Sequence, residues 1–205
     1  MARIVYLFMF LFSVNAFSQN TINSFFDLSS PERWWVVIHP FKAKKAFNIS
    51  KEVLKTTDSI SKLGVIGKDI NGGQLDAFKH SFWLVKMSNI IGQNSALKLG
   101  KAHEKGNHQA FKKHRLEDGT LPDKISSEMD LFNNKVGVHI FVQNKNLNEK
   151  ELIGLLLSEI QNGKMKIIKK DAFNNFLTCD GVIIPKDSLM GKWENKKCLI
   201  PSNNK

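Results

Sequence analysis

Two ionisable residues one helical turn apart, Asp76 and His80, are the first feature of this chain that could do chemistry. With Trp83 and Met87 they occupy positions i, i+4, i+7 and i+11 of a helix predicted over residues 76–91, on a single face. The large apolar members must pack inward, so Asp76 and His80 are expected to face the interior or a cleft, where an unpaired carboxylate is costly. Both are candidate catalytic residues. The alternative is that Asp76 caps the helix and holds His80, with no chemistry.

His103 and Glu104 form a second polar motif, near the end of a helix predicted from Asn94 to about Lys105. Adjacent helical residues diverge by about 100°. We therefore expect one of the two to face a common site, while the other contacts a loop or a supporting residue.

A third helix, predicted over residues 126–142, carries a polar stripe. Asp130, Asn133, Asn134 and Gly137 lie at i, i+3, i+4 and i+7. Adjacent asparagines in mid-helix are unfavourable by propensity, so these amides either cross-link neighbouring helices or bind something. The glycine indicates close approach of another backbone.

Together these motifs resemble the three signature blocks of an uncharacterised bacterial domain family, found in exported and toxin-like proteins. The blocks are Asp76-Ala-Phe-Lys-His80-Ser-Phe-Trp83, Ala102-His103-Glu104 and Met129-Asp130-Leu-Phe-Asn133-Asn134-Lys-Val-Gly137. The resemblance covers about residues 70–142. It implies membership of the family and brings no activity with it.

Two classes of function remain open. The first is a metal-assisted hydrolase acting on a phosphoester or lipid-like substrate, with a divalent metal as cofactor. Its chain order is similar to that of metal-dependent phosphohydrolases with a His…His-Asp…Asp pattern, from which Glu104 departs. Metal-free acid/base chemistry through Glu104 and a histidine is a variant. The second class is a non-catalytic exported binding or structural domain with a buried polar network. The candidate catalytic residues are Asp76, His80, His103, Glu104 and Asp130; the metal ligands are His80, His103 and Asp130; the substrate-binding residues are Trp83, Asn133 and Asn134.

The N-terminus has the pattern of a secretory signal peptide. Arg3 precedes an apolar run over residues 4–14, and Ala16 and Ser18 form a small-x-small cleavage site. The run is shorter than the roughly 20 residues that span a bilayer, so cleavage after residue 18 is favoured over a retained anchor. We expect a periplasmic or extracellular protein without a transmembrane segment. In that oxidising setting its two cysteines, Cys179 and Cys198, are predicted to form a disulfide.

The remaining chain predicts a mainly α fold with orthogonal or bundle-like packing of about five helices. Residues 19–163 form the helical domain, and residues 164–205 form a small extension with a β hairpin of strands 165–168 and 181–184. Trp34 and Trp35 are predicted core anchors. A net charge of +11 suits an anionic surface or a phosphate-containing substrate. The lysines are scattered and not interleaved with aromatics, so no specific nucleic-acid signal is present.

Overall fold

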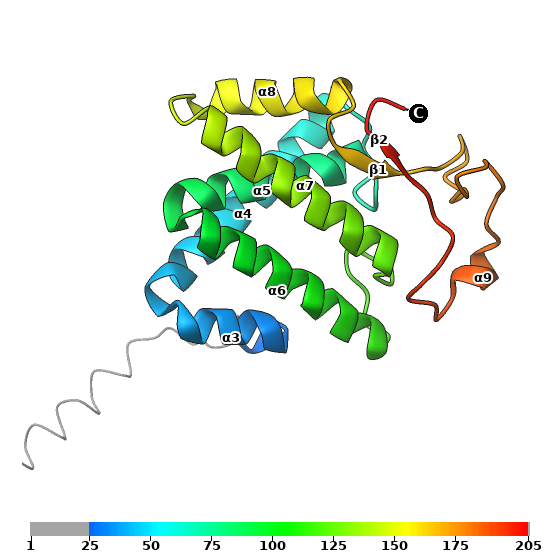
Figure 1. Ribbon diagram of the computed structural model, residues 1–205, viewed down its shortest axis with the longest axis horizontal. Coiled ribbons are helices and arrows are strands. Elements are labelled where there is room, and N and C mark those ends of the chain that lie inside the picture. Colours follow the sequence, from blue (N-terminus) through cyan, green and yellow to red (C-terminus); the bar gives the residue numbers. More distant parts are fainter. Residues whose placement is uncertain (1–24, 205) are drawn as a thin grey trace, which may run out of the picture.

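One helix, α5 (Gln74–Ile91), lies at the centre of the structure, a computed structural model that describes residues 25–204. Helices α4 (Pro40–Leu63), α6 (Gln93–Lys112), α7 (Lys124–Gln143) and α8 (Glu149–Gln161) surround it (Figure 1). Because α5 is covered on several sides, its large apolar side chains form the middle of the core: Leu75, Phe78, Phe82, Leu84 and Met87. The predicted mainly α class is confirmed.

Local capping signals set several helix ends. Helix α3 (Ser30–Ile38) begins with a capping box between Ser29 and Glu32. Helix α4 ends at Gly64, whose φ of 66° lies in the left-handed region that glycine favours. Helix α8 begins with a capping box from Asn148. These ends are set by residues that are local in the sequence.

Over residues 25–204 the number of helices exceeds the predicted five, because α3 and the short α9 (Lys186–Leu189) add to the five longer helices. Helix α6 also continues to Lys112, where the sequence predicted an end at Gly106. A Cβ at Gly106 would lie 2.4 Å from Ser29 Oγ, so this glycine permits close packing on α3 and does not end the helix.

The small sheet differs from the predicted hairpin. Strand β1 (Lys166–Ile168) pairs antiparallel with β2 (Leu199–Pro201), and Ile167 lies opposite Ile200. The predicted strand over residues 181–184 contributes only an isolated bridge, between Leu177 and Ile183. The prediction of that strand was wrong because the partner of β1 comes from the end of the chain, beyond a long loop.

The C-terminal extension folds against one end of the helices (Figure 1). Cys179 and Cys198 form the predicted disulfide, with their Cα atoms 4.9 Å apart. Within the extension Trp193 packs on α6, with ring centroids 4.4 Å from His108 and 5.3 Å from Phe111. The disulfide thus closes a loop that is also anchored between its ends.

The predicted signal peptide, residues 1–18, lies outside the described residues. No helix in the described range 25–204 is long and apolar enough to cross a membrane. Of the two predicted core anchors, Trp35 is buried and Trp34 is 67% exposed. The prediction for Trp34 was wrong, because adjacent positions on a helix point about 100° apart and only Trp35 faces the core.

Candidate functional site

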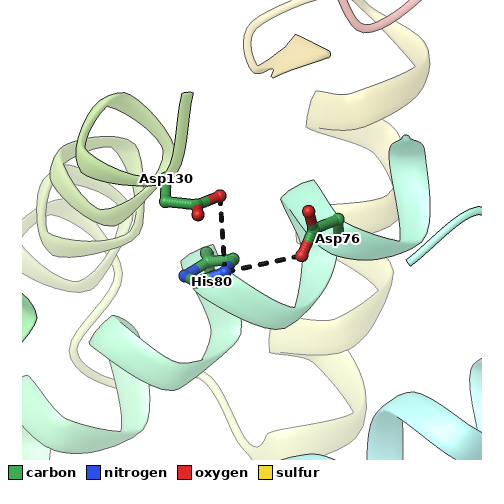
Figure 2. A group of neighbouring side chains, drawn as sticks. All are labelled: Asp76, His80 and Asp130. Atoms are coloured by element: carbon green, nitrogen blue, oxygen red, sulfur yellow. Dashed lines mark ion pairs between the residues drawn. The ribbon is translucent and has the colours of Figure 1, made fainter. Parts of the chain in front are cut away.

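Three buried ionisable side chains meet between α5 and α7. Asp76 and His80 lie one turn apart on α5, and Asp130 faces them from α7 (Figure 2). His80 Nε2 lies 3.4 Å from Asp76 Oδ1 and 3.3 Å from Asp130 Oδ1. Each of the three residues is at most 6% exposed. The structure therefore brings together three of the five predicted catalytic residues.

Helices α5 and α7 approach closely because Gly137 has no side chain. A Cβ added at Gly137 would lie 2.3 Å from the backbone oxygen of Ser81. Ser81 directly follows His80, so this contact holds the His80 turn against α7. The close backbone approach predicted at Gly137 is confirmed.

The donor atoms of Asp76, His80 and Asp130 have the spacing of ligands around one small cation. All three atoms lie within 4.8 Å of one another. Around a tetrahedral ion with metal–ligand distances of about 2.0–2.2 Å, neighbouring ligand atoms are about 3.3–3.6 Å apart. The distances from His80 Nε2 to the two carboxylate oxygens, 3.3 and 3.4 Å, fall in that range. One imidazole and two carboxylates are ligand types that divalent transition ions accept.

Burial and charge act differently on the two carboxylates. Burial alone would raise the pKa of Asp76, but the facing His80 and Lys79 lower it to about 2. Burial raises the pKa of Asp130 well above its usual range, and the charges of Asp76 and Glu104 raise it further. Within the described residues, Asp130 Oδ1 makes no well-aligned hydrogen bond, although His80 Nε2 lies 3.3 Å from it. A cation bound between the carboxylates would offset the cost of a charged Asp130.

Lys79 joins this group to the loop that lies over it, residues 113–123. Its ammonium nitrogen lies 2.9 Å from Asp76 Oδ1 and 2.8 Å from Asp118 Oδ2. Burial would lower the pKa of Lys79, but the two carboxylates raise it above its usual value. Lys79 therefore remains charged and ties the loop to α5.

His103 lies beside the group and does not belong to it. Its ring centroid is 6.3 Å from that of His80. Nδ1 lies 3.0 Å from Glu32 Oε1, and Nε2 lies 2.9 Å from Glu117 Oε1. Although burial opposes protonation, these carboxylates raise the pKa of His103 well above its usual value. His103, predicted as a metal ligand, thus bridges α3 and the loop as a cation, and Asp76 takes its place in the group of three.

Glu104 points in another direction from its neighbour His103, as adjacent positions on a helix predict. It is 5% exposed, and its Oε2 accepts a hydrogen bond from Asn107 Nδ2 at 3.2 Å. Burial raises the pKa of Glu104. Its other oxygen, Oε1, is buried without a partner among the described residues.

The three predicted substrate-binding residues have different surroundings. Trp83 lies against His103, and its Nε1 donates to Ser50 Oγ at 3.0 Å. Both amide atoms of Asn133 form hydrogen bonds with the backbone of β1. Its Nδ2 donates to the Lys166 oxygen, and its Oδ1 accepts from the Lys166 nitrogen, both at 2.9 Å. Asn134 is 2% exposed, and neither of its amide atoms has a partner in the described range. The structure therefore gives Asn133 a packing role.

A family model described as a domain of unknown function, DUF6973, matches residues 33–164. This match spans more than half of the chain and includes the group of three. The chain belongs to this family. No curated protein and no solved structure matches it. The predicted resemblance to an uncharacterised domain is confirmed, while the bacterial origin and the individual motif blocks stay predictions.

In this DUF6973 member, the group of three lines a cavity of about 690 Å³. Residues 116–123 of the loop line another part of it, and the C-terminal extension adds three lysines: Lys186, Lys192 and Lys197. A second cavity of about 240 Å³ shares Lys79 and His80 with the first and is lined by Trp83. His80 therefore lies between a larger cavity lined by both carboxylates and lysines and a smaller one with an aromatic side chain.

Sequence reasoning misses Lys79, Glu117 and Asp118. Lys79 lies three residues after Asp76, the spacing of a helical ion pair, so a local signal was present. Glu117 and Asp118 lie in a loop whose only sequence signal is the Asp118-Gly119 turn, with φ of 47° at Asp118 and 80° at Gly119. Their placement against His103 and Lys79 depends on the tertiary fold.

Proposed function

We propose that the chain is a metal-dependent hydrolase in which Asp76, His80 and Asp130 bind a divalent cation. The observation that carries the proposal is the meeting of three buried donor atoms, from two helices, at the wall of the 690 Å³ cavity. A purely structural network would be expected to satisfy its polar atoms. In the described range Asp130 Oδ1 lies 3.3 Å from His80 Nε2 but makes no well-aligned hydrogen bond, and this poor pairing favours a cation ligand over a packing residue.

The substrate class that the cavity favours is a phosphoester. The charge of Lys79 is already paired with Asp76 and Asp118, but the exposed Lys186 and Lys192 also line the cavity. Positive charge at these points suits phosphate oxygens. A phosphoester is therefore favoured over an uncharged lipid-like ester.

The bound cation would polarise a phosphoryl oxygen of the substrate and activate a water molecule. In the hydrolysis, the water oxygen forms a bond to phosphorus, and the bond from phosphorus to the leaving oxygen breaks. The hydroxyl stays on phosphorus, and one proton of the water ends on the leaving oxygen. Because the pKa of Lys79 is raised, Lys79 stabilises negative charge and does not transfer the proton.

Elemental analysis of the purified protein, combined with a panel of phosphomonoesters and phosphodiesters, tests the proposal. We expect about one divalent ion per chain, and loss of that ion with His80→Ala and Asp130→Asn. Each variant should lower hydrolysis by more than about a hundredfold, because a catalytic metal supplies several kcal/mol of transition-state stabilisation. His139→Ala and Glu128→Gln are matched controls, since both residues are exposed on α7 and neither lines the two cavities.

The opposite result would support a structural network. If the parent protein holds no metal and both variants lose about 3–5 kcal/mol of unfolding free energy, the group serves only to stabilise the packing of α5 against α7. That outcome would leave the non-catalytic binding or structural domain as the function.

We also propose that the chain is exported after cleavage of residues 1–18. The disulfide between Cys179 and Cys198 supports this, because disulfides persist mainly in oxidising compartments. N-terminal sequencing of protein recovered from the producing cell tests it. A chain that begins after Ser18 or Gln19 is expected, and an intact Met1 would contradict the proposal.

A further inference from the structure

Four large apolar side chains within eight consecutive residues are exposed at the junction of α3 and α4. Trp34 is 67% exposed, Val37 58%, Ile38 66% and Phe41 92%. We call these four residues the α3–α4 patch. Single exposed apolar residues are ordinary, but a local group that includes two aromatic rings is typical of an interaction surface.

The exposure of the patch follows from the way α3 is anchored. Trp35 faces the core, and its Nε1 donates to the backbone oxygen of Ser95 at 3.1 Å. Lys42, in the first turn of α4, donates to the Ile91 oxygen at 2.8 Å and to Ser95 Oγ at 2.7 Å. These contacts fix both helices on the end of α5 and the start of α6. The patch is therefore held outward on ordered helices.

The chain around the patch is strongly basic. No aspartate or glutamate occurs between Glu32 and Glu52, whereas the same stretch contains five cationic residues: Arg33, Lys42, Lys44, Lys45 and Lys51. Lys44 and Lys45 are exposed next to Phe41. Exposed aromatic and aliphatic side chains beside lysines are the composition of surfaces that lie in a membrane interface.

We propose that the α3–α4 patch binds an anionic lipid surface. Trp34, Ile38 and Phe41 enter the boundary between headgroups and acyl chains, while Lys44 and Lys45 contact lipid phosphates. A second copy of this chain fits the patch less well, because a symmetric contact would bring two basic stretches together. The proposal is independent of the proposed hydrolase, since no patch residue lines either cavity.

The position of the patch is compatible with activity at a membrane. In Figure 1, α3 and the start of α4 lie at the opposite side of the molecule from α9 and the C-terminal extension. The extension carries Lys186 and Lys192, which line the larger cavity. A protein bound through the patch would keep this wall of the cavity away from the lipid.

Sedimentation with vesicles of phosphatidylcholine, with and without phosphatidylglycerol, tests the proposal. We expect the parent chain to bind the anionic vesicles and to lose binding as salt rises. Trp34→Ala combined with Phe41→Ala should lower the partition coefficient by more than about tenfold. Lys44→Glu combined with Lys45→Glu should lower it at least as much. The parent and every variant are measured both with and without residues 1–18, so that any binding through the apolar run over residues 4–14 is determined separately.

Two matched controls separate the patch from general effects. Phe173→Ala removes another aromatic ring that is 85% exposed, on the C-terminal extension. Lys112→Glu with Lys113→Glu changes the net charge by the same amount, on exposed residues at the end of α6. Both controls should bind as the parent does. Equal losses in patch and control variants, no binding by the parent, or patch-dependent dimers without vesicle binding would each overturn the proposal.

Discussion

Replacing Gly137 with alanine should separate the two helices that carry the group of three. The added Cβ would lie 2.3 Å from the Ser81 oxygen and 3.0 Å from the Ser81 Cα and carbonyl carbon. All three contacts are with backbone atoms of a buried helix, so no flexible side chain can move aside. Carbon–oxygen contacts between packed helices are ordinarily about 3.3–3.6 Å. Helices α5 and α7 must therefore move apart by about 1 Å near His80.

This displacement sets the expected magnitude. Overpacking a well-packed interface costs about 1–3 kcal/mol, and for a domain of this size each kcal/mol lowers Tm by about 2–4 °C. We therefore expect Gly137→Ala to lower Tm by about 2–12 °C. An increase of about 1 Å in the 3.3 Å separation of His80 Nε2 and Asp130 Oδ1 should also weaken cation binding.

Gly154→Ala provides a matched control in thermal unfolding and in titration with Zn²⁺ or Mn²⁺. Gly154 lies in mid-helix on α8, is exposed, and has nothing within 4 Å of an added Cβ. Alanine there should stabilise by about 0.5–1 kcal/mol, because glycine costs that much inside a helix. If Gly137→Ala were as stable as Gly154→Ala, the inferred close contact between α5 and α7 would be refuted.

Three more predictions follow from single contacts. Replacing Cys179 and Cys198 with serine frees a loop of sequence separation 19 and should cost about 3 kcal/mol in urea unfolding; an unchanged midpoint would contradict this. The raised pKa of His103 means that its ion pairs stabilise fully below about pH 6.5 and are lost as pH rises through the raised value. The Tm difference between parent and His103→Gln should therefore shrink toward alkaline pH, and a difference that grows would be the wrong sign. Asn133→Leu leaves two backbone groups of β1 unpaired and should cost about 1–3 kcal/mol; amide exchange in β1 as slow as in the parent would argue against it.

The parts of the fold that follow from sequence are those with local causes. The capping box at Asn148 and the left-handed Gly64 define helix ends within a few residues, and both were predictable. Gly64 ends helix α4, whereas Gly106 lies inside helix α6 and does not end it. The lack of a side chain at Gly106 allows Ser29, at the start of α3, to pack against α6. The pairing of β1 with β2 likewise joins segments about 30 residues apart in the sequence, and no local sequence pattern predicts it.

The candidate site also has a part that follows from local sequence and a part that depends on tertiary contacts. Helical spacing places Asp76 and His80 on one face, since both lie on one helix. Their meeting with Asp130 depends on the contact between α5 and α7, and its sequence signal is the stripe that ends in Gly137. The partners of His103 were not predictable, because Glu32 comes from α3 and Glu117 from the loop.

The polar stripe on α7 itself favours a binding site over a packing network. Asn133 and Asn134 are adjacent, identical in type and almost fully buried. Asn133 faces β1 and uses both amide atoms in short hydrogen bonds, as a residue selected for packing would. Asn134 lies one turn from Asp130 on another side of the helix, and neither of its amide atoms has a partner among the described residues. Asp130 Oδ1 has the contact with His80 at 3.3 Å but no well-aligned hydrogen bond there. Helix α7 therefore satisfies its polar groups on the side of the sheet but not on the side of the group of three. A ligand explains these poorly paired groups better than loose packing does.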